Sequence, residues 1–190
     1  MKKPNSTRLY LYSSVFAALT AAGAFIKIPV PPVPFTLQTI FVFLSAGLLG
    51  PAGGFMSQSL YLITGLAGLP VFAYGGGLGY VYQPTFGFLA SYPVAAFVCG
   101  LLTKSLIKDT LNNRSVILKY ILIYSAGTFI VFFIGLAYLA FQTEYIAGKE
   151  IEFYPFIRSG FIIFIPTSLV KIAVSGYLTI RLRKTGFFNF

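Results

Sequence analysis

Six long apolar stretches, joined by short polar or proline- and glycine-rich connections, constrain what this chain can fold into. They cover residues 9–26, 37–49, 55–69, 86–102, 116–141 and 161–180. A helix needs about 20 apolar residues to cross a bilayer. Of the 190 residues, 57% are hydrophobic and 9% are charged, which is far from the composition of a soluble domain. We therefore predict an all-α membrane protein with six transmembrane helices, forming a single integral membrane domain over residues 1–190.

Glycines and prolines define the connections. Gly50, Pro51, Gly53 and Gly54 separate the second and third stretches, which are short for a bilayer, and we expect a tight turn there. Short spans can be tilted, or buried against protein rather than lipid. The segment 27–34 cannot be helical, because its prolines lack a donor and disfavour helical geometry in the residue before them. Irregular backbone at membrane depth must be buried or line a cavity, so we expect this proline loop to fold over a pocket.

The basic residues predict the orientation in the membrane. Six spans place both termini on one side, which would then carry Lys2, Lys3, Arg8, Lys104, Lys108, Arg114, Lys119, Arg181, Arg183 and Lys184. The opposite side would carry only Lys27, Lys149 and Arg158. The positive-inside rule therefore places both termini in the cytoplasm. Because membrane topology explains the net charge of +10, we expect lipid and no nucleic acid as a partner.

Lys171 is the only charged residue deep within an apolar stretch. A lysine near the middle of a bilayer costs about 3 kcal/mol, and such residues usually mark a substrate or ion site. The four carboxylates lie in polar connections, at Asp109, Glu144, Glu150 and Glu152. The simplest interpretation is that the missing anion arrives with a ligand. The alternative is that Lys171 extends to the membrane interface or donates to backbone carbonyls.

Pro166 interrupts the last stretch shortly before Lys171. We expect a helix to begin there, with Thr167 or Ser168 as its cap. Lys171 would then lie one turn into this helix. The helix N-terminus adds about half a positive charge, so this arrangement predicts a receptor for a carboxylate.

A glycine run over residues 75–79 offers further candidates for ligand contact. Gly76 and Gly77 would present backbone N–H groups to a ligand, or the run is simply a flexible loop. It is not a phosphate-binding P-loop, because the Lys-Ser/Thr ending is missing. Tyr80 and Tyr82 would wall an aromatic cavity, although tyrosines near a membrane boundary are most often interfacial anchors.

Thr36 and Gln38 follow the proline loop. Gln38 offers one acceptor and two donors, which suit an amide or ureido group. On residue chemistry alone, we slightly favour the alternative that the two residues cap the second helix.

Small residues recur in the first stretch. Ala17 with Ala21, and Ala18 with Ala22, form faces of the small-xxx-small type that let helices approach closely. Such a face serves internal packing or the docking of another membrane subunit.

Catalysis is not expected of this chain. It contains no histidine, and Cys99, its only cysteine, has no neighbouring base. It has no Walker motif and therefore cannot hydrolyse ATP itself. We expect no metal and no cofactor.

Several motifs, in their order along the chain, resemble one family. They are Pro31-Pro-Val-Pro-Phe-Thr-Leu-Gln-Thr39, Leu48-Leu-Gly-Pro51 and Gly65-Leu-Ala-Gly-Leu-Pro-Val-Phe-Ala73, the last followed by the glycine run. They look like the BioY family, the biotin-specific S components of energy-coupling factor (ECF) transporters. The resemblance implies a six-helix bundle in the plasma membrane of a prokaryote, which binds biotin in a pocket near the extracellular side. It also implies a transmembrane coupling protein, which would meet the alanine-rich face of the first helix, and two cytoplasmic ATPases that drive release by toppling the S component.

Two departures from the family pattern concern the ligand. The family's Pro-Gly-Asp-Leu-x-Lys reads Pro166-Thr-Ser-Leu-Val-Lys171 here, so Lys171 matches while Ser168 replaces an aspartate that would accept from the ureido N–H. The family's Gly-Pro-Thr-Gly-Gly-Tyr reads Gln83-Pro-Thr-Phe-Gly-Phe88. Charge-assisted hydrogen bonds are about twice as strong as neutral ones. Affinity is therefore lower, or Gln83 or Gln38 compensates, or the ligand is a relative of biotin.

The leading hypothesis is a biotin-binding subunit in which Lys171 pairs with the valerate carboxylate. The proline and glycine loops would then enclose the bicyclic rings. A second hypothesis is a self-sufficient channel or secondary carrier for a small organic anion, which would work without ATPase partners. A third is a membrane scaffold without a ligand.

Overall fold

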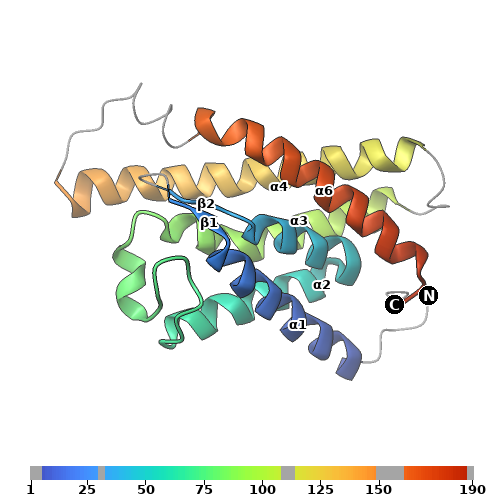
Figure 1. The fold of residues 1–190 in the computed structure, drawn as a ribbon, viewed down its shortest axis with the longest axis horizontal. Coiled ribbons are helices and arrows are strands. Elements are labelled where there is room, and N and C mark those ends of the chain that lie inside the picture. Colours follow the sequence, from blue (N-terminus) through green and yellow to red (C-terminus); the bar gives the residue numbers. More distant parts are fainter. Residues whose placement is uncertain (1–5, 30–32, 108–113, 149–160, 188–190) are drawn as a thin grey trace.

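The structure, a computed structural model, describes residues 6–29, 33–107, 114–148 and 161–187. Long helices make up most of it: α1 (Ser6–Phe25), α2 (Gln38–Leu66), α3 (Phe86–Leu106), α4 (Arg114–Phe141) and α6 (Ile165–Lys184). The short elements are β1 (Lys27–Ile28), β2 (Phe35–Thr36) and the helical turns η1 (Leu78–Tyr82), η2 (Gln142–Ile146) and η3 (Ile162–Phe164). Strands β1 and β2 form a small antiparallel pair that links α1 to α2 (Figure 1). The prediction of a helical fold is confirmed.

Helix α2 folds back on itself at Gly50. That residue has φ 72° and ψ −169°, which are not helical angles, and a positive φ costs glycine nothing. Pro51 then begins the second half, where a proline needs no hydrogen-bond partner for its nitrogen. A Cβ on Gly54 would lie 3.1 Å from the Cα of Ala46, so the two halves run antiparallel and in close contact (Figure 1). The predicted break is present, but it is confined to Gly50.

Four helical segments are long and apolar enough to cross a membrane within the described part of the chain. They are Gln38–Leu66, Phe86–Leu106, Ser115–Ile146 and Ile162–Lys184. The first includes both halves of α2. Residues 42–49, in the first half, are all buried inside the protein, which explains how so short a half-helix can sit within the bundle. The fold is that of a multi-pass membrane protein.

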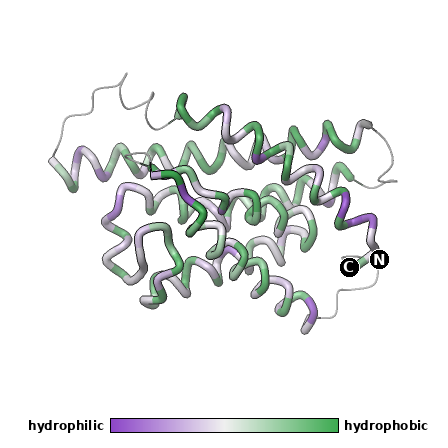
Figure 2. The backbone as a smooth tube through the Cα atoms, viewed as in Figure 1, coloured by the Kyte–Doolittle hydropathy of each residue, from purple (hydrophilic) through white to green (hydrophobic). Residues whose placement is uncertain are grey.

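The two ends of the bundle differ in character. Helices α1 and α4 begin, and α3 and α6 end, at one end, while the β1–β2 pair and η1 lie at the other (Figure 1). The last turn of α6 carries Arg181, Arg183 and Lys184. Figure 2 shows hydrophilic backbone at the end of α6 and the start of α1, with hydrophobic residues along the helices between the two ends.

Close contacts between side chains join α2, α4 and α6. Tyr124 of α4 stacks on Phe43 of α2 with ring centroids 5.0 Å apart. Its hydroxyl lies 2.8 Å from the Thr179 hydroxyl of α6. Polar groups that meet between helices in this way stabilise a bundle in lipid. These contacts fix α6 against α4, and so position the side chains near the start of α6.

The turn at Gly50 requires a glycine on α3. A Cβ on Gly100 would lie 2.5 Å from the nitrogen of Pro51 and 2.6 Å from the carbonyl carbon of Gly50. We expect Gly100→Ala to lower the free energy of unfolding by about 1–3 kcal/mol, because α3 must move away from the turn. Gly79→Ala is the control, because nothing lies within 4 Å of its added Cβ. Thermal unfolding in detergent measures both, and equal midpoints for the two variants would contradict this close approach.

Candidate ligand-binding site

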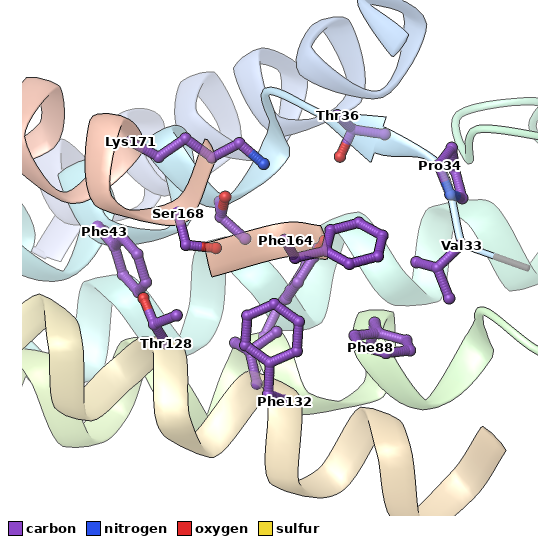
Figure 3. A pocket seen from close by; sticks show the side chains of 13 residues that line it. Val33, Pro34, Thr36, Phe43, Phe88, Thr128, Phe132, Phe164, Ser168 and Lys171 are labelled. Carbon is purple, nitrogen blue, oxygen red and sulfur yellow. The ribbon is translucent and has the colours of Figure 1, made fainter. Parts of the chain in front are cut away.

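A cavity opens between the β2 strand, the start of α6 and the second half of α4. It encloses about 510 Å³ of empty space, counted with the part that is open to solvent. Its walls come from every layer of the bundle except α1: Val33, Pro34, Thr36, Thr39, Phe43, Phe88, Tyr92, Thr128, Val131, Phe132, Phe164, Ser168 and Lys171. Figure 3 shows these side chains as sticks and labels most of them.

Aromatic rings form one side of the cavity. Phe132 lies 5.9 Å from Phe164 and 6.0 Å from Phe88, measured between ring centroids. Phe35, just outside the cavity, packs on Phe164 at 4.4 Å, which fixes the position of that ring. Figure 3 shows Phe88, Phe132 and Phe164 grouped away from the polar side chains. This side is suited to the apolar face of a small ring system.

Lys171 and Ser168 supply the polar side of the cavity from α6. They are three residues apart and therefore lie on the same face of the helix. In the described part of the chain, the Lys171 amine has no hydrogen-bond or ion-pair partner. Glu144 is the one carboxylate in that part, and it is exposed on η2. The amine reaches toward the side of the cavity where Thr36 lies (Figure 3). The cavity thus presents a cation whose counter-ion must come from elsewhere.

The start of α6 differs from the prediction. The N-cap residue is Phe164, without a side-chain cap, and the Thr167 hydroxyl donates to the Phe164 carbonyl at 3.0 Å instead. Because η3 leads directly into α6, helical geometry begins before Pro166. Lys171 is therefore the seventh residue of α6, from Ile165, and the field of a helix end falls off within the first turn. The predictions of a Thr167 or Ser168 cap and of a single turn before Lys171 are wrong.

Thr36 lines the cavity, whereas Gln38 lies behind it. The Thr36 hydroxyl donates to Gln38 Oε1 at 2.9 Å, and Gln38 Nε2 donates to the Tyr61 hydroxyl at 2.6 Å. Neither residue caps α2, whose N-cap is Leu37 without a side-chain hydrogen bond. The expectation that they serve as caps is therefore wrong. Gln38 is 2% exposed and supports the wall from within.

The glycine run packs against the end of α2 and does not line this cavity. The Gly77 N–H donates to the Gly65 carbonyl at 2.7 Å. A Cβ on Gly76 would collide with the Leu69 carbonyl, so this position needs glycine for packing. Gly76 and Gly77 were predicted to contact the ligand, but the structure uses them to fold the loop onto α2.

The aromatic and amide candidates beyond the glycine run also lie outside the cavity wall. Tyr80 is buried against Phe72, with ring centroids 4.6 Å apart. Its hydroxyl accepts from Thr85 at 3.3 Å. Tyr82 is 67% exposed and Gln83 is exposed as well. The structure therefore brings together Lys171, Ser168 and Thr36, and separates them from Tyr80, Tyr82 and Gln83.

Most of the apolar wall was not identified from the sequence. Phe43, Phe88, Phe132 and Phe164 belong to apolar stretches in which nothing distinguishes a cavity-facing phenylalanine from a lipid-facing one. Thr128 carries a weak signal, because it is a polar residue within the apolar segment of α4. Residues 30–32 of the proline loop, and the connections that hold Asp109, Glu150 and Glu152, lie outside the described residues.

The two alanine faces of α1 have different surroundings. Ala17 is buried, and Ala21 packs against the core. Ala18 and Ala22 are exposed. One face therefore serves internal packing, and the other is open on the surface of the described bundle.

Comparisons with known proteins agree on one family. Residues 1–186 match the BioY family. A probable biotin transporter BioY of Lysinibacillus sphaericus is 50% identical over 129 residues, which are 67% of this chain and 66% of that protein. The biotin transporter BioY of Thermotoga maritima is 35% identical over 178 residues, covering 93% of this chain and 96% of the relative. A crystal structure of the S component for biotin from an ECF-type ABC transporter superposes with a TM-score of 0.82 at 27% identity, over 99% of this chain and 97% of that one.

The cavity predicts which serines of α6 a water-soluble thiol reagent can reach. Cys99 is 0% exposed and is the only cysteine, so the background labelling should be low. We expect Ser168→Cys to be labelled rapidly, because Ser168 lines the cavity. Ser175→Cys, in the same helix but 0% exposed, should be labelled at least tenfold more slowly. Mass spectrometry of the intact protein measures both rates, and equal rates would contradict an open cavity at Ser168.

Proposed function

This chain belongs to the BioY family, and we propose that its cavity holds biotin, with Lys171 paired to the carboxylate. The similarity to named biotin transporters and to a biotin S component makes the chain a biotin uptake subunit of an ECF-type transporter, and not an enzyme. The observation that carries the assignment to this cavity is the unpartnered amine of Lys171 beside an aromatic wall.

The chemical groups of biotin are complementary to the polar side and the aromatic side of the cavity. It carries one carboxylate, which would neutralise Lys171 where water is scarce and where charge-assisted hydrogen bonds are strong. Its bicyclic ring system has apolar faces that suit the side made by Phe88, Phe132 and Phe164. Its ureido group needs acceptors for two N–H groups, and hydroxyl groups line the same cavity at Thr36, Thr39, Thr128 and Ser168.

We propose that the chain crosses the membrane six times, through α1, the two halves of α2, α3, α4 and α6. Both termini would then lie on one side, together with the basic last turn of α6. The positive-inside rule assigns that side to the cytoplasm. The β1–β2 pair and the cavity would face outward, where biotin arrives.

We further propose that this chain works with an ECF coupling protein and two cytoplasmic ATPases. It contains no motif for ATP hydrolysis. The exposed face of Ala18 and Ala22 offers a helix surface that another membrane helix can approach closely. That face lies on α1, which does not line the cavity, so docking and ligand binding can occur on separate surfaces.

The first test is biotin binding to the purified protein in detergent. We expect Lys171→Ala to weaken binding by about 2–5 kcal/mol, because the ligand carboxylate is left without its partner. Biotin methyl ester lacks the negative charge and should therefore bind the wild-type protein much more weakly than biotin does. In Lys171→Ala, the two ligands should bind with similar affinity. Isothermal titration measures both.

Lys104→Ala is the matched control for this test. Lys104 lies in the last turn of α3, at the end of the bundle opposite the β1–β2 pair (Figure 1). Its removal takes away the same charge without touching the cavity. If Lys171→Ala binds biotin as tightly as Lys104→Ala does, Lys171 does not hold the carboxylate.

The docking surface makes a second prediction. In cells that express the coupling protein and both ATPases, Ala18→Phe should reduce biotin uptake at least fivefold, because the bulky ring blocks close approach of helices. Biotin binding to the purified variant should remain unchanged. Leu19→Phe, at a neighbouring exposed position of α1, is the control. Uptake that persists at the same rate without any ATPase would favour the self-sufficient carrier instead.

A further inference from the structure

A chain of hydrogen bonds runs from the cavity wall into the bundle. Thr36 on β2 donates its hydroxyl proton to Gln38 Oε1 at 2.9 Å. Gln38 Nε2 donates to the Tyr61 hydroxyl at 2.6 Å, and the Tyr61 hydroxyl donates to the Val71 carbonyl at 3.3 Å. These bonds connect β2, both halves of α2 and the loop that follows α2.

The last acceptor determines the direction of the whole chain. A backbone carbonyl can only accept, so Tyr61 must give its single proton to Val71. The Tyr61 oxygen then accepts from Gln38, which places the amide nitrogen toward Tyr61 and the amide oxygen toward Thr36. An amide oxygen also only accepts. Thr36 must therefore direct its proton to Gln38 and away from the cavity.

Thr36 consequently presents no proton to a ligand. Its oxygen also forms a hydrogen bond with the Tyr92 hydroxyl, which must be the donor, so one lone pair of the Thr36 oxygen remains for a ligand. Thr36 is 7% exposed, with Gln38 and Tyr61 at 2% and 1%, so water does not readily compete for these bonds. Figure 3 shows the Thr36 hydroxyl on the same side of the cavity as the Lys171 amine. An oxygen that can only accept disfavours a carboxylate and favours an N–H group.

We propose that Thr36 Oγ1 accepts a hydrogen bond from one ureido N–H of biotin, and that Gln38 and Tyr61 are positioning residues that hold this polarity. The proposal rests on the proposed function of biotin binding. It explains selectivity for an N–H group of the ligand through three buried residues. Thr36 lies in the cavity wall, whereas Gln38 and Tyr61 lie behind it. A ligand that offered an acceptor in place of the N–H would leave two oxygens facing each other.

In this proposal, Thr36 supplies the hydrogen-bond acceptor for the ureido N–H, because α6 offers no carboxylate for that role. Ser168 stands where the family pattern has an aspartate. Of the two glutamines that were candidates to compensate, Gln83 is exposed outside the cavity. Both ends of the Gln38 amide are engaged by Thr36 and Tyr61. Gln38 therefore compensates indirectly, by directing the Thr36 proton.

The test is a double-mutant cycle in which one change is made in Thr36 and the other in the ureido group of the ligand. Thr36→Val keeps the shape of the side chain but removes the acceptor, and two biotin analogues each carry a methyl group on one ureido nitrogen. We expect Thr36→Val to weaken biotin binding roughly 5- to 100-fold, because a desolvated N–H loses its partner. One of the two analogues should show a much smaller loss on Thr36→Val than biotin does. Thr36→Ser should restore both the affinity and the discrimination.

Tyr61→Phe tests the direction of the chain while keeping the Thr36 hydroxyl. Without the Tyr61 hydroxyl, the Gln38 amide is free to turn and the Thr36 proton can face the ligand. We expect the discrimination between biotin and that same analogue to fall at least threefold, whereas a purely structural effect would weaken both ligands equally. Thr64→Val, which changes a threonine of α2 outside the cavity wall, is the matched control and should leave the discrimination intact.

Three results would overturn the proposal. They are biotin affinity within twofold of wild type in Thr36→Val, equal losses for biotin and both analogues, or a loss of discrimination in Thr64→Val instead. In each of these the wild-type protein still binds biotin, so the proposed function survives. A folded wild-type protein that binds no biotin would overturn the proposed function and this assignment together.

Discussion

The uncompensated charge of Lys171 is the constraint on which the rest of the structure depends. A bare lysine in a bilayer costs about 3 kcal/mol, and the one described carboxylate, Glu144, lies exposed on η2. The bundle tolerates this charge by placing it beside a cavity instead of in lipid. The contacts of Tyr124 with Phe43 and Thr179 hold α2 and α6 against α4, and all three helices contribute to the cavity wall. A carboxylate in this cavity would stabilise the site by neutralising Lys171.

The sequence predicts the fold well because local chemistry determines its breaks. Gly50 and Pro51 interrupt α2 where an apolar run alone would continue, and the prolines before β2 prevent helix formation between α1 and α2. The length of the apolar stretches then predicts the class of a helical membrane protein, whereas the orientation that the basic residues indicate stays a prediction. The start of α6 was less predictable, because a proline is accepted in the first turn of a helix, and nothing in the sequence indicates that η3 precedes it.

The site was predictable only where a residue conflicts with its surroundings. Lys171 is conspicuous as a charge in an apolar stretch, and the neighbouring Ser168 follows from the family pattern. Phe132 and Phe164 are inconspicuous, because a phenylalanine that faces a cavity and one that faces lipid occur in the same kind of sequence. Glycines such as Gly76 are ambiguous in the sequence, since close packing of backbone on backbone and contact with a ligand both require the absence of a side chain.

Separate physical requirements for holding and for releasing the ligand support the proposal that this chain works with partners. A carboxylate bound to Lys171 removes the cost of the buried charge, so its departure restores that cost unless water enters the cavity. The described contacts of α2, α4 and α6 hold the wall together, and nothing in the sequence can hydrolyse ATP to open it. Energy must then reach the bundle through a surface away from the cavity. Helix α1 provides one, because its inner face packs on the core through Ala17 while Ala18 and Ala22 remain exposed. On the proposed function, a partner bound to α1 would move the whole bundle and expose the cavity to cytoplasmic water, which would hydrate Lys171 in place of the ligand.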